Sequence, residues 1–532
     1  MTVRSLTKAD SLPAGARRGA AMAVVPLLGL IGSSLAVGPA QAGASPLGRG
    51  PSSPAATPIR HLVVIYQENH SFDNYFGTYP QAANPTGEPA FRAAPGTPAA
   101  NGLTQGLIAH NPNLASPYRL DRSQEVTCDN SHSYTPLQAA YDQGLVDHFV
   151  QAVGPTGKGC QPSLTMGHYD GNTVTALWNY AQHFSMSDSN FADTFGSSVP
   201  QALNLISGQV HGAVPSRPTP TVANDTVIAN LPPTHDDCNA SAAPNLTTLE
   251  MTGRNIGDLL NARSVTWGWF TGGFRPTSQV NGAAVCGSSH KNIAGVVQND
   301  YFNGEEDPFQ YYASTSNAHH LAPSSLATIG QSDRAHHQYD LADFWEAAGA
   351  RNMPAVSFLR APSYAIGHPG FSDPLDEQHF LVTTINRLER LPSWRSTAVV
   401  ITWDESDGWY DHVMPPIVNP SNDPVRDVLA GSHLCGTPKP EAYLDLCGYG
   451  PRTPELVISP YAKANFVDHS PTAQSSIMAF IEDNWGLGRI GNQSFDSRSG
   501  SIAGMFDFTR PSNHRLFLDP TVGKLIPGRS AR

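Results

Sequence analysis

The sequence predicts an α/β protein with a mostly parallel sheet that helices cover on both faces. Short runs of β-branched and apolar residues alternate with longer segments whose apolar residues recur every three or four positions. Strands that alternate with helices are typical of parallel sheets built from crossover units. The 47 glycines and 45 prolines among 532 residues add long loops to this framework, and loops commonly carry functional sites.

Five runs have the composition of buried strands. The first, HLVVIY, is apolar throughout after its initial histidine, as a strand covered on both faces should be. The predicted strands are 61–66, 265–270, 355–359, 397–403 and 456–459. We expect them to form one central sheet, because no internal repeat or clean domain boundary separates them.

Five segments between or after these strands have helical periodicity. The predicted helices are 174–184, 255–262, 339–350, 375–391 and 471–485. Pro471 follows Ser470, and proline is well suited to the first turn of a helix, so we expect the last helix to begin there. Residues 81–120 and 210–250 lack periodicity and are rich in Pro, Asn, Thr and Ala, which indicates long insertions.

The N-terminal 42 residues have the pattern of an export signal. Arg17 and Arg18 precede a small, apolar stretch, and Ala40-Gln41-Ala42 matches a signal-peptidase site. The alternative is a membrane anchor, but Gly, Pro and Ser interrupt the stretch. We predict a signal peptide at 1–42, a disordered leader at 43–58 and one domain at 59–532. The protein would be secreted or in the cell envelope, exported by Sec or Tat.

Composition narrows the possible partners. The formal net charge is −12, so the chain lacks the basic balance of a nucleic-acid groove. No later hydrophobic segment predicts a stable membrane span. The six cysteines fit disulfides in an exported protein. Cys435 and Cys447 would close the shortest loop and are the first expected pair, and Cys160 is expected to be half of another. The sequence does not predict the oligomeric state.

Polar clusters follow two of the predicted strands. Glu68 and Asn69 come after the strand at 61–66, and Asp404 and Glu405 follow the strand at 397–403. In open α/β sheets the site lies at the carboxyl ends of the strands, and hard oxygen ligands suit a divalent cation. The alternative is that these residues cap helices and shape turns. Two clusters at two strand ends favour a metal site.

Ser198 precedes Pro200 and an apolar run, so it should open a helix. The free N–H groups at such a helix start favour a phosphate anion. A serine at this position is either a nucleophile or an ordinary helix cap.

Several motifs in order resemble a known family. They are 68–73 (ENHSFD), 165–170 (TMGHYD), 197–200 (SSVP), 307–312 (DPFQYY), 319–323 (HHLAP), 403–408 (WDESDG), 450–452 (GPR) and 467–469 (VDH). Together they resemble the secreted bacterial phospholipase C and acid phosphatase phosphoesterases, nearer the acid phosphatases, over about residues 60–490. The resemblance implies an alkaline phosphatase-like three-layer sandwich and a metal-dependent hydrolase of phosphoric esters that acts through a phosphoserine.

The resemblance also implies roles for single residues. The expected ligands of one divalent cation of unknown identity are Glu68, Asn69, Asp404, Glu405 and Ser198. Ser198 is the implied nucleophile, and His132 and His368 match histidines that face the phosphate. Many relatives have Asp where Glu405 stands. The expected substrate is a small phosphomonoester or a phospholipid headgroup.

One departure from the family pattern stands before DPFQYY. Acid phosphatase relatives often have a histidine pair there, whereas this chain has Glu305-Glu306-Asp307, which removes a phosphate contact and adds negative charge. Two other functions stay open. Cys160-Gln-Pro-Ser-Leu164 resembles the sulfatase motif C-x-P-S-R without its arginine, so a sulfatase-like hydrolase on the same fold is one alternative. A catalytically weak envelope protein that binds anions is the other.

Overall fold

A computed structural model describes residues 55–528, apart from 125, 241–244, 303, 304, 306, 430–434, 436–440 and 513. The predicted signal peptide at 1–42 and most of the predicted leader lie outside the described residues. The last residues of the predicted leader contact the domain: the backbone N–H of Ala56 donates to the carbonyl of Asn484 at 2.7 Å, and the Thr57 N–H donates to the Asn484 side chain at 3.0 Å.

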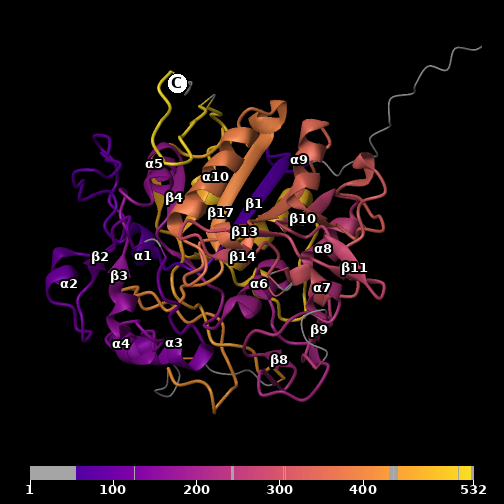
Figure 1. Ribbon diagram of the computed structural model, residues 1–532, viewed down its shortest axis with the longest axis horizontal. Helices are drawn as coiled ribbons and strands as arrows, with labels where there is room; N and C mark the ends of the chain where they lie inside the picture. The colour runs from indigo at the N-terminus through magenta and orange to yellow at the C-terminus, as the bar shows by residue number, and fades with distance from the viewer. Residues whose placement is uncertain are drawn as a thin grey trace, which may run out of the picture. The chain divides into compact units, whose positions relative to one another are not determined.

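The core is an eight-stranded sheet (Figure 1). Its strands, in spatial order, are β15 (Gln338–Asp340), β10 (Trp267–Thr271), β16 (Val356–Arg360), β1 (His61–Gln67), β17 (Thr397–Trp403), β18 (Glu455–Ile458), β4 (Ser185–Ser187) and β19 (Phe466–Asp468). Only β18 runs against the others, as its antiparallel pairing with β17 and with β4 shows. All five predicted strands form and lie in this sheet, which confirms the α/β class.

Helices cover both faces of the sheet, because consecutive residues of a strand point to opposite sides. Leu62 and Val64 of β1 belong to one apolar cluster, with residues of α6 (Ser198–Ser207), α8 (Ile256–Ala262) and α11 (Gln474–Trp485). Val63 and Ile65 belong to another, with α5 (Thr175–His183), α9 (Leu341–Gly349) and α10 (Pro374–Leu388). The three-layer sandwich is therefore confirmed.

The predicted start of the last helix is wrong. Thr472 and Ala473 form β20 and pair with β5 (Asn190–Phe191), so α11 begins only at Gln474, and Pro471 lies before both elements. The extended backbone of β20 cannot also make a helical first turn. The helix proper ends at Trp485, as predicted.

The loops carry short helices and two-stranded sheets. The helices are α1 (Phe72–Phe76), α2 (Gln105–Ala109), α3 (Tyr134–Tyr141), α4 (Phe149–Ala152) and α7 (Asp237–Ala240). The strand pairs are β2 (Tyr118–Arg119) with β3 (Gly167–His168), β6 (Ala213–Pro215) with β9 (Leu249–Met251), β7 (Val222–Ala223) with β8 (Thr226–Val227), β11 (Ser278–Val280) with β12 (Ala283–Val285), and β13 (Ser289–Lys291) with β14 (Val297–Asn299). The predicted insertions thus hold short ordered elements.

Three disulfides join loops around the sheet. They link Cys128 to Cys160, Cys238 to Cys286, and Cys435 to Cys447. The predicted pairing of Cys435 with Cys447 is confirmed, and so is the expectation that Cys160 is half of a disulfide.

Within the described residues, no helix combines the length and the apolarity that crossing a membrane requires.

Candidate active site

The ends of β1 and β17 bring the predicted ligands together. The two strands are parallel neighbours with Gln67 opposite Trp403, and the Asp404 N–H donates to the Gln67 carbonyl at 3.0 Å. The residues that follow, Glu68 on one strand and Asp404 on the other, therefore lie side by side at the carboxyl edge of the sheet. The side chains of both are buried.

These side chains carry polar atoms without partners. Glu68 Oε2, both amide atoms of Asn69, both carboxyl oxygens of Asp404 and Oε1 of Glu405 are buried and make no hydrogen bond. Buried polar atoms are normally paired, since leaving them unpaired costs free energy. A set of hard oxygens that lacks partners in one place fits a divalent cation. Asn69 and the three carboxylates are thus suited to hold one.

The electrostatics point the same way. Burial, and then the charge of Glu68, raise the pKa of Asp404 well above its usual value. Burial also raises the pKa of Glu405, and the neighbouring Asp404 adds to this, whereas His132 opposes it. Like charges in a dry site repel unless a cation compensates them. Within the described residues, however, the carboxyl oxygens of Glu68, Asp404 and Glu405 do not all lie within 4.8 Å of one another. Their convergence on one cation remains a prediction.

Ser198 is the first residue of α6, as predicted, and only 3% of it is exposed. The residue in the capping position is Ser197, so the alternative role of Ser198 as the helix cap is wrong. The Ser198 side chain lowers the pKa of Asp404, which places it beside that carboxyl, although neither Asp404 oxygen has a hydrogen bond of standard geometry. Asn230, from the 210–250 insertion, accepts a hydrogen bond from the Val199 N–H at 2.9 Å.

His132 and His368 lie near each other, with ring centroids 6.1 Å apart. Burial lowers the pKa of His132, but the charges of Glu405 and Asp407 outweigh burial and raise this pKa well above its usual value. His132 Nδ1 lies 3.1 Å from Asp407 Oδ1. A cationic imidazole is thereby favoured at this position.

His368 follows Gly367, whose φ of +92° a residue with a side chain rarely adopts. A Cβ at Gly367 would also meet the Glu68 carbonyl at 2.6 Å. His368 Nδ1 donates to the Pro369 carbonyl at 2.6 Å, and its Nε2 lies 3.8 Å from Glu68 Oε2. Burial lowers the pKa of His368. Both predicted histidines are thus placed around the unpartnered carboxylates.

Two residues at this site were not predicted from the sequence. Arg360, at the end of β16, makes an ion pair with Glu68 Oε1. Only the register, which sets Arg360 opposite Tyr66 of β1, puts it there. Asp407 has a φ of +51°, as residues in turns can have, and its Oδ1 lies 3.1 Å from His132 Nδ1, so it also orients that ring.

A second buried cluster lies on the same two chain segments, and we call it the Arg452 clamp. The guanidinium of Arg452 contacts Asp411 at 2.9 and 3.1 Å and Asp73 at 3.2 Å. It also donates to the carbonyls of Asn101 and Asp188, each at 2.8 Å. Because Asp73 follows β1 and Asp411 follows β17, the clamp joins the two segments that carry the predicted ligands.

His412 belongs to this clamp. Its backbone N–H donates to Asp73 Oδ2 at 2.9 Å, and its ring Nδ1 lies 2.6 Å from the same oxygen. The sequence order Asp411-His412 did not reveal Asp73 as the partner.

Glu305, in the acidic stretch that replaces the histidine pair of acid phosphatase relatives, lies near the site. Burial raises the pKa of Glu305 to about 7, and the charge of Glu68 contributes to this rise. Glu306 lies outside the described residues. Asp307 is buried, with both carboxyl oxygens unpartnered, and burial raises its pKa as well.

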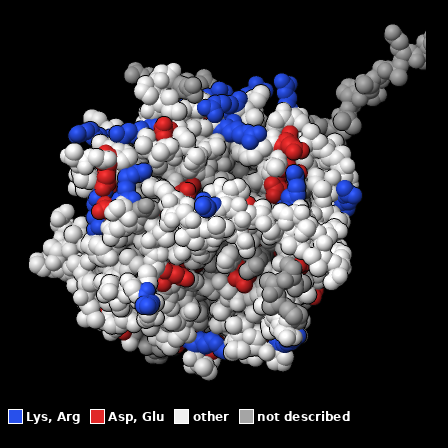
Figure 2. Space-filling model, in the orientation of Figure 1, with Lys and Arg blue, Asp and Glu red and all other residues white. Residues whose placement is uncertain are grey.

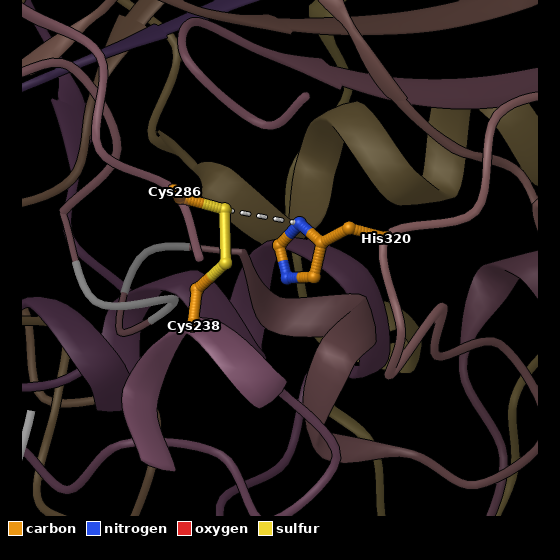
Figure 3. A group of neighbouring side chains, drawn as sticks. All are labelled: Cys238, Cys286 and His320. Carbon is orange, nitrogen blue, oxygen red and sulfur yellow. Dashed lines mark hydrogen bonds between the residues drawn. A yellow bond between two sulfur atoms is a disulfide. The ribbon is translucent and has the colours of Figure 1, made fainter. Parts of the chain in front are cut away.

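Two groups of residues that contain cysteines could suggest a sulfatase nucleophile or a metal site, but their cysteines form disulfides. Cys160 is bonded to Cys128, so it is not the free residue that a sulfatase would modify. Figure 3 shows Cys238 bonded to Cys286, with His320 beside them and its Nδ1 3.5 Å from the Cys286 sulfur. His320 Nε2 also pairs with the buried Asp236 at 2.9 Å. Sulfurs in a disulfide do not bind a metal as thiolates, so this group is structural.

Comparison with known proteins gives a consistent result for the family. The model of the Phosphoesterase family matches residues 59–488. Phospholipase C B of Mycobacterium tuberculosis is 26% identical over 482 residues, which cover 88% of this chain and 81% of that protein. Non-hemolytic phospholipase C of Pseudomonas aeruginosa is 24% identical over 474 residues, which cover 86% and 58% of the two chains.

Likeness to solved structures is looser. A protein in the alkaline phosphatase superfamily from Vibrio parahaemolyticus has a TM-score of 0.28 and 10% identity, and the match covers 76% of this chain and 79% of that one. Murine ectonucleotide pyrophosphatase / phosphodiesterase 5 has a TM-score of 0.31 and 13% identity, with 63% and 95% covered. At these TM-scores the superpositions assign neither a site nor a function.

Proposed function

Since the chain belongs to the Phosphoesterase family and is a hydrolase of phosphoric esters, we propose that Ser198 is its nucleophile and that a divalent cation completes its site. The observation that carries this proposal is the group of buried, unpartnered oxygens at the ends of β1 and β17, beside the first residue of α6. Neither part alone would suffice. Together they supply a metal-ligand set and a hydroxyl next to it.

The residues that would hold the cation are Glu68, Asn69, Asp404 and Glu405, with Ser198 as a further ligand. A divalent cation bound there polarises a phosphoryl oxygen and lowers the pKa of a neighbouring hydroxyl. Arg360 would keep Glu68 in place, because it pairs with the carboxyl oxygen that is not free.

The proposed reaction has two displacements. Ser198 Oγ, having lost its proton to solvent, attacks phosphorus, and the bond from phosphorus to the leaving oxygen breaks. His132, whose cationic form is favoured, holds a phosphoryl oxygen and supplies the proton that the leaving oxygen takes up, while His368 lies beside the same phosphoryl group. Water then attacks the phosphoserine, the bond from phosphorus to Oγ breaks, and phosphate leaves while Ser198 regains a proton. Asp407 fixes the ring of His132 throughout.

The substrate would be a small phosphomonoester or a phospholipid. Relatives named phospholipase C support a phospholipid, whereas the motif resemblance to acid phosphatases supports monoesters. Three disulfides support export to an oxidising compartment, which fits the signal predicted at residues 1–42.

A substrate panel tests the proposal. The purified protein should hydrolyse p-nitrophenyl phosphate or phosphatidylcholine, should lose this activity in EDTA, and should regain it when a divalent cation is added back. It should leave p-nitrophenyl sulfate intact. Turnover of phosphate esters that EDTA does not affect would contradict the metal proposal. Phosphate binding without turnover would support the weak anion-binding alternative instead.

A further inference from the structure

The hairpin of β13 and β14 exposes apolar side chains next to the candidate site. Ile293 and Val296, in its turn, and Val297, in β14, are 47%, 52% and 59% exposed. Three large apolar side chains on one short hairpin cost solvation free energy and are typical of an interaction surface. In Figure 2 the surface around β13 and β14 is mostly uncharged, with one cationic side chain at its centre, and β13 ends in the exposed Lys291.

The hairpin is fixed to the segment that holds His368. The side chain of Asn292 donates to the Phe371 carbonyl at 3.1 Å, and the Ile293 N–H donates to Asp376 Oδ2 at 2.7 Å. His290, in β13, contacts Asp300 at 2.7 Å and packs against the ring of Tyr364. The hairpin therefore has a defined position relative to His368.

Two stacked aromatic rings lie between solvent and His368. The Phe371 ring stacks on His368, with centroids 4.3 Å apart, and Phe302 stacks on Phe371 at 5.4 Å. Both phenylalanines are only partly buried. Phe302 and Phe371 thus form an apolar surface beside a histidine that faces the proposed phosphate position, and the Asn292 hydrogen bond to the Phe371 carbonyl holds the hairpin next to it.

We propose that the β13–β14 hairpin docks the protein on a zwitterionic lipid surface, with Ile293, Val296 and Val297 entering the interface. The apolar part of a lipid phosphoester would then lie along Phe371 and Phe302 while its phosphate reaches His368. The assignment of phosphate to His368 rests on the proposed function, but the docking does not. The net charge of −12 disfavours an anionic surface, so the attraction is apolar.

Vesicle binding tests the docking. Wild-type protein should sediment with phosphatidylcholine vesicles in EDTA, which prevents the lipid from being hydrolysed. The fraction bound should be about the same in roughly 0.1 M and 1 M salt, because salt screens only the interactions between charges. The double variant Ile293→Asp with Val297→Asp should bind at least about tenfold more weakly. Val214→Asp is the matched control, because Val214 is 51% exposed on β6, away from the hairpin, and it should bind like wild type.

Activity separates this inference from the proposed function. All three proteins should hydrolyse soluble p-nitrophenyl phosphate equally, while the double variant alone loses turnover of phosphatidylcholine vesicles. The milder Val297→Thr variant, which keeps the side-chain shape, should show a smaller loss of binding in the same direction. The docking would be overturned if the wild-type protein does not bind vesicles or binds only anionic ones. It would also be overturned if Val214→Asp weakens vesicle binding as much as the double variant does. Vesicle binding without any phosphoester turnover would instead overturn the proposed function and leave the docking standing.

Discussion

Two buried charge clusters lie on the same two chain segments, and they differ in whether their charges have partners. In the Arg452 clamp, Asp73 and Asp411 each accept hydrogen bonds from the guanidinium, and His412 adds two contacts to Asp73. A few residues away, Asp404 has no hydrogen bond to either carboxyl oxygen, and Glu68 and Glu405 each have one oxygen without a partner.

The difference indicates separate roles for the two clusters. A buried ion group with all its hydrogen bonds made can fix the backbone, because any movement would expose unpaired charge. A buried group left without partners destabilises the protein until a ligand arrives, and such costs are typical of functional sites. Loss of a clamp residue should therefore change stability, whereas loss of a site residue should change activity.

The largest expected effect is on turnover. Ser198→Ala removes the proposed nucleophile, and kcat should fall on the order of 10⁶-fold, as when a nucleophilic serine is deleted elsewhere. The melting temperature should stay near that of wild type, because the hydroxyl is not the cap of α6. Steady-state kinetics and calorimetry check both parts.

Ser197→Ala is the matched control for this variant. Ser197 is the preceding residue, and its buried hydroxyl makes no hydrogen bond, so turnover should change by no more than a few fold. Equal losses in both variants, or near-normal turnover in Ser198→Ala, would remove Ser198 from the reaction.

The next effect is on stability. Arg452→Met leaves Asp73 and Asp411 buried without their cation, and the free energy of unfolding should fall by roughly 3–5 kcal/mol. Urea denaturation measures it. Asp483→Asn is the control, since Asp483 is 68% exposed and its ion pair with Arg489 lies at the surface, where a pair contributes about 0–1 kcal/mol. A clamp variant as stable as this control would mean that the two clusters do not differ in role.

Asp404→Asn tests the cluster of carboxylates without partners in the same way. It removes one of the unpartnered, mutually repelling carboxylates, so the metal-free protein should gain stability, on the order of 2 kcal/mol. The same variant should lose the rise in melting temperature that a divalent cation gives the wild type. Thermal melts in EDTA and in excess cation give both values. Lower stability of the variant in EDTA would show that Asp404 already has a stabilising partner.

The smallest effect concerns a carboxyl outside the site. Burial raises the pKa of Glu455 to about 8, and neither of its oxygens has a hydrogen bond. A folded-state pKa above the usual 4.5 means that the folded protein binds the extra proton. Glu455 therefore stabilises fully below the unfolded pKa, and this contribution is lost as the pH rises towards 8, by at most about 1.4 kcal/mol per pH unit.

Denaturation of wild type and Glu455→Gln at several pH values between 5 and 8 checks this prediction. The variant should show the flatter dependence of stability on pH. Equal slopes would mean that Glu455 is ionised in the fold and must have a partner. The expected result would separate a carboxyl that a proton satisfies from carboxylates that await a cation.

Much of this arrangement follows from the sequence. The apolar run at 397–403 marks β17 to the residue, and the polar residues after β1 and β17 mark the site edge, because both signals are local. The start of α11 was missed because the pairing of Thr472 with Asn190 lies 282 residues away along the chain. The short strand β4, Ser-Met-Ser, has no apolar run to announce it.

The partners of the site residues were harder to predict than the residues themselves. Arg360 reaches Glu68 only through the register of β16 with β1, and Arg452 reaches Asp73 across 379 residues. Such ion pairs leave no periodic pattern in the sequence. The disulfide from Cys435 to Cys447 was predictable because its loop is short, whereas the spacing of the other four cysteines does not favour one pairing over another.

The most direct test of the central claim is to trap the covalent intermediate. Wild-type protein incubated with a ³²P-labelled phosphate ester and quenched in acid should carry label, and peptide mapping should find it on Ser198. Removal of divalent cations before mixing should prevent the labelling. Steady turnover with no labelled protein, or label on a residue other than Ser198, would contradict the account.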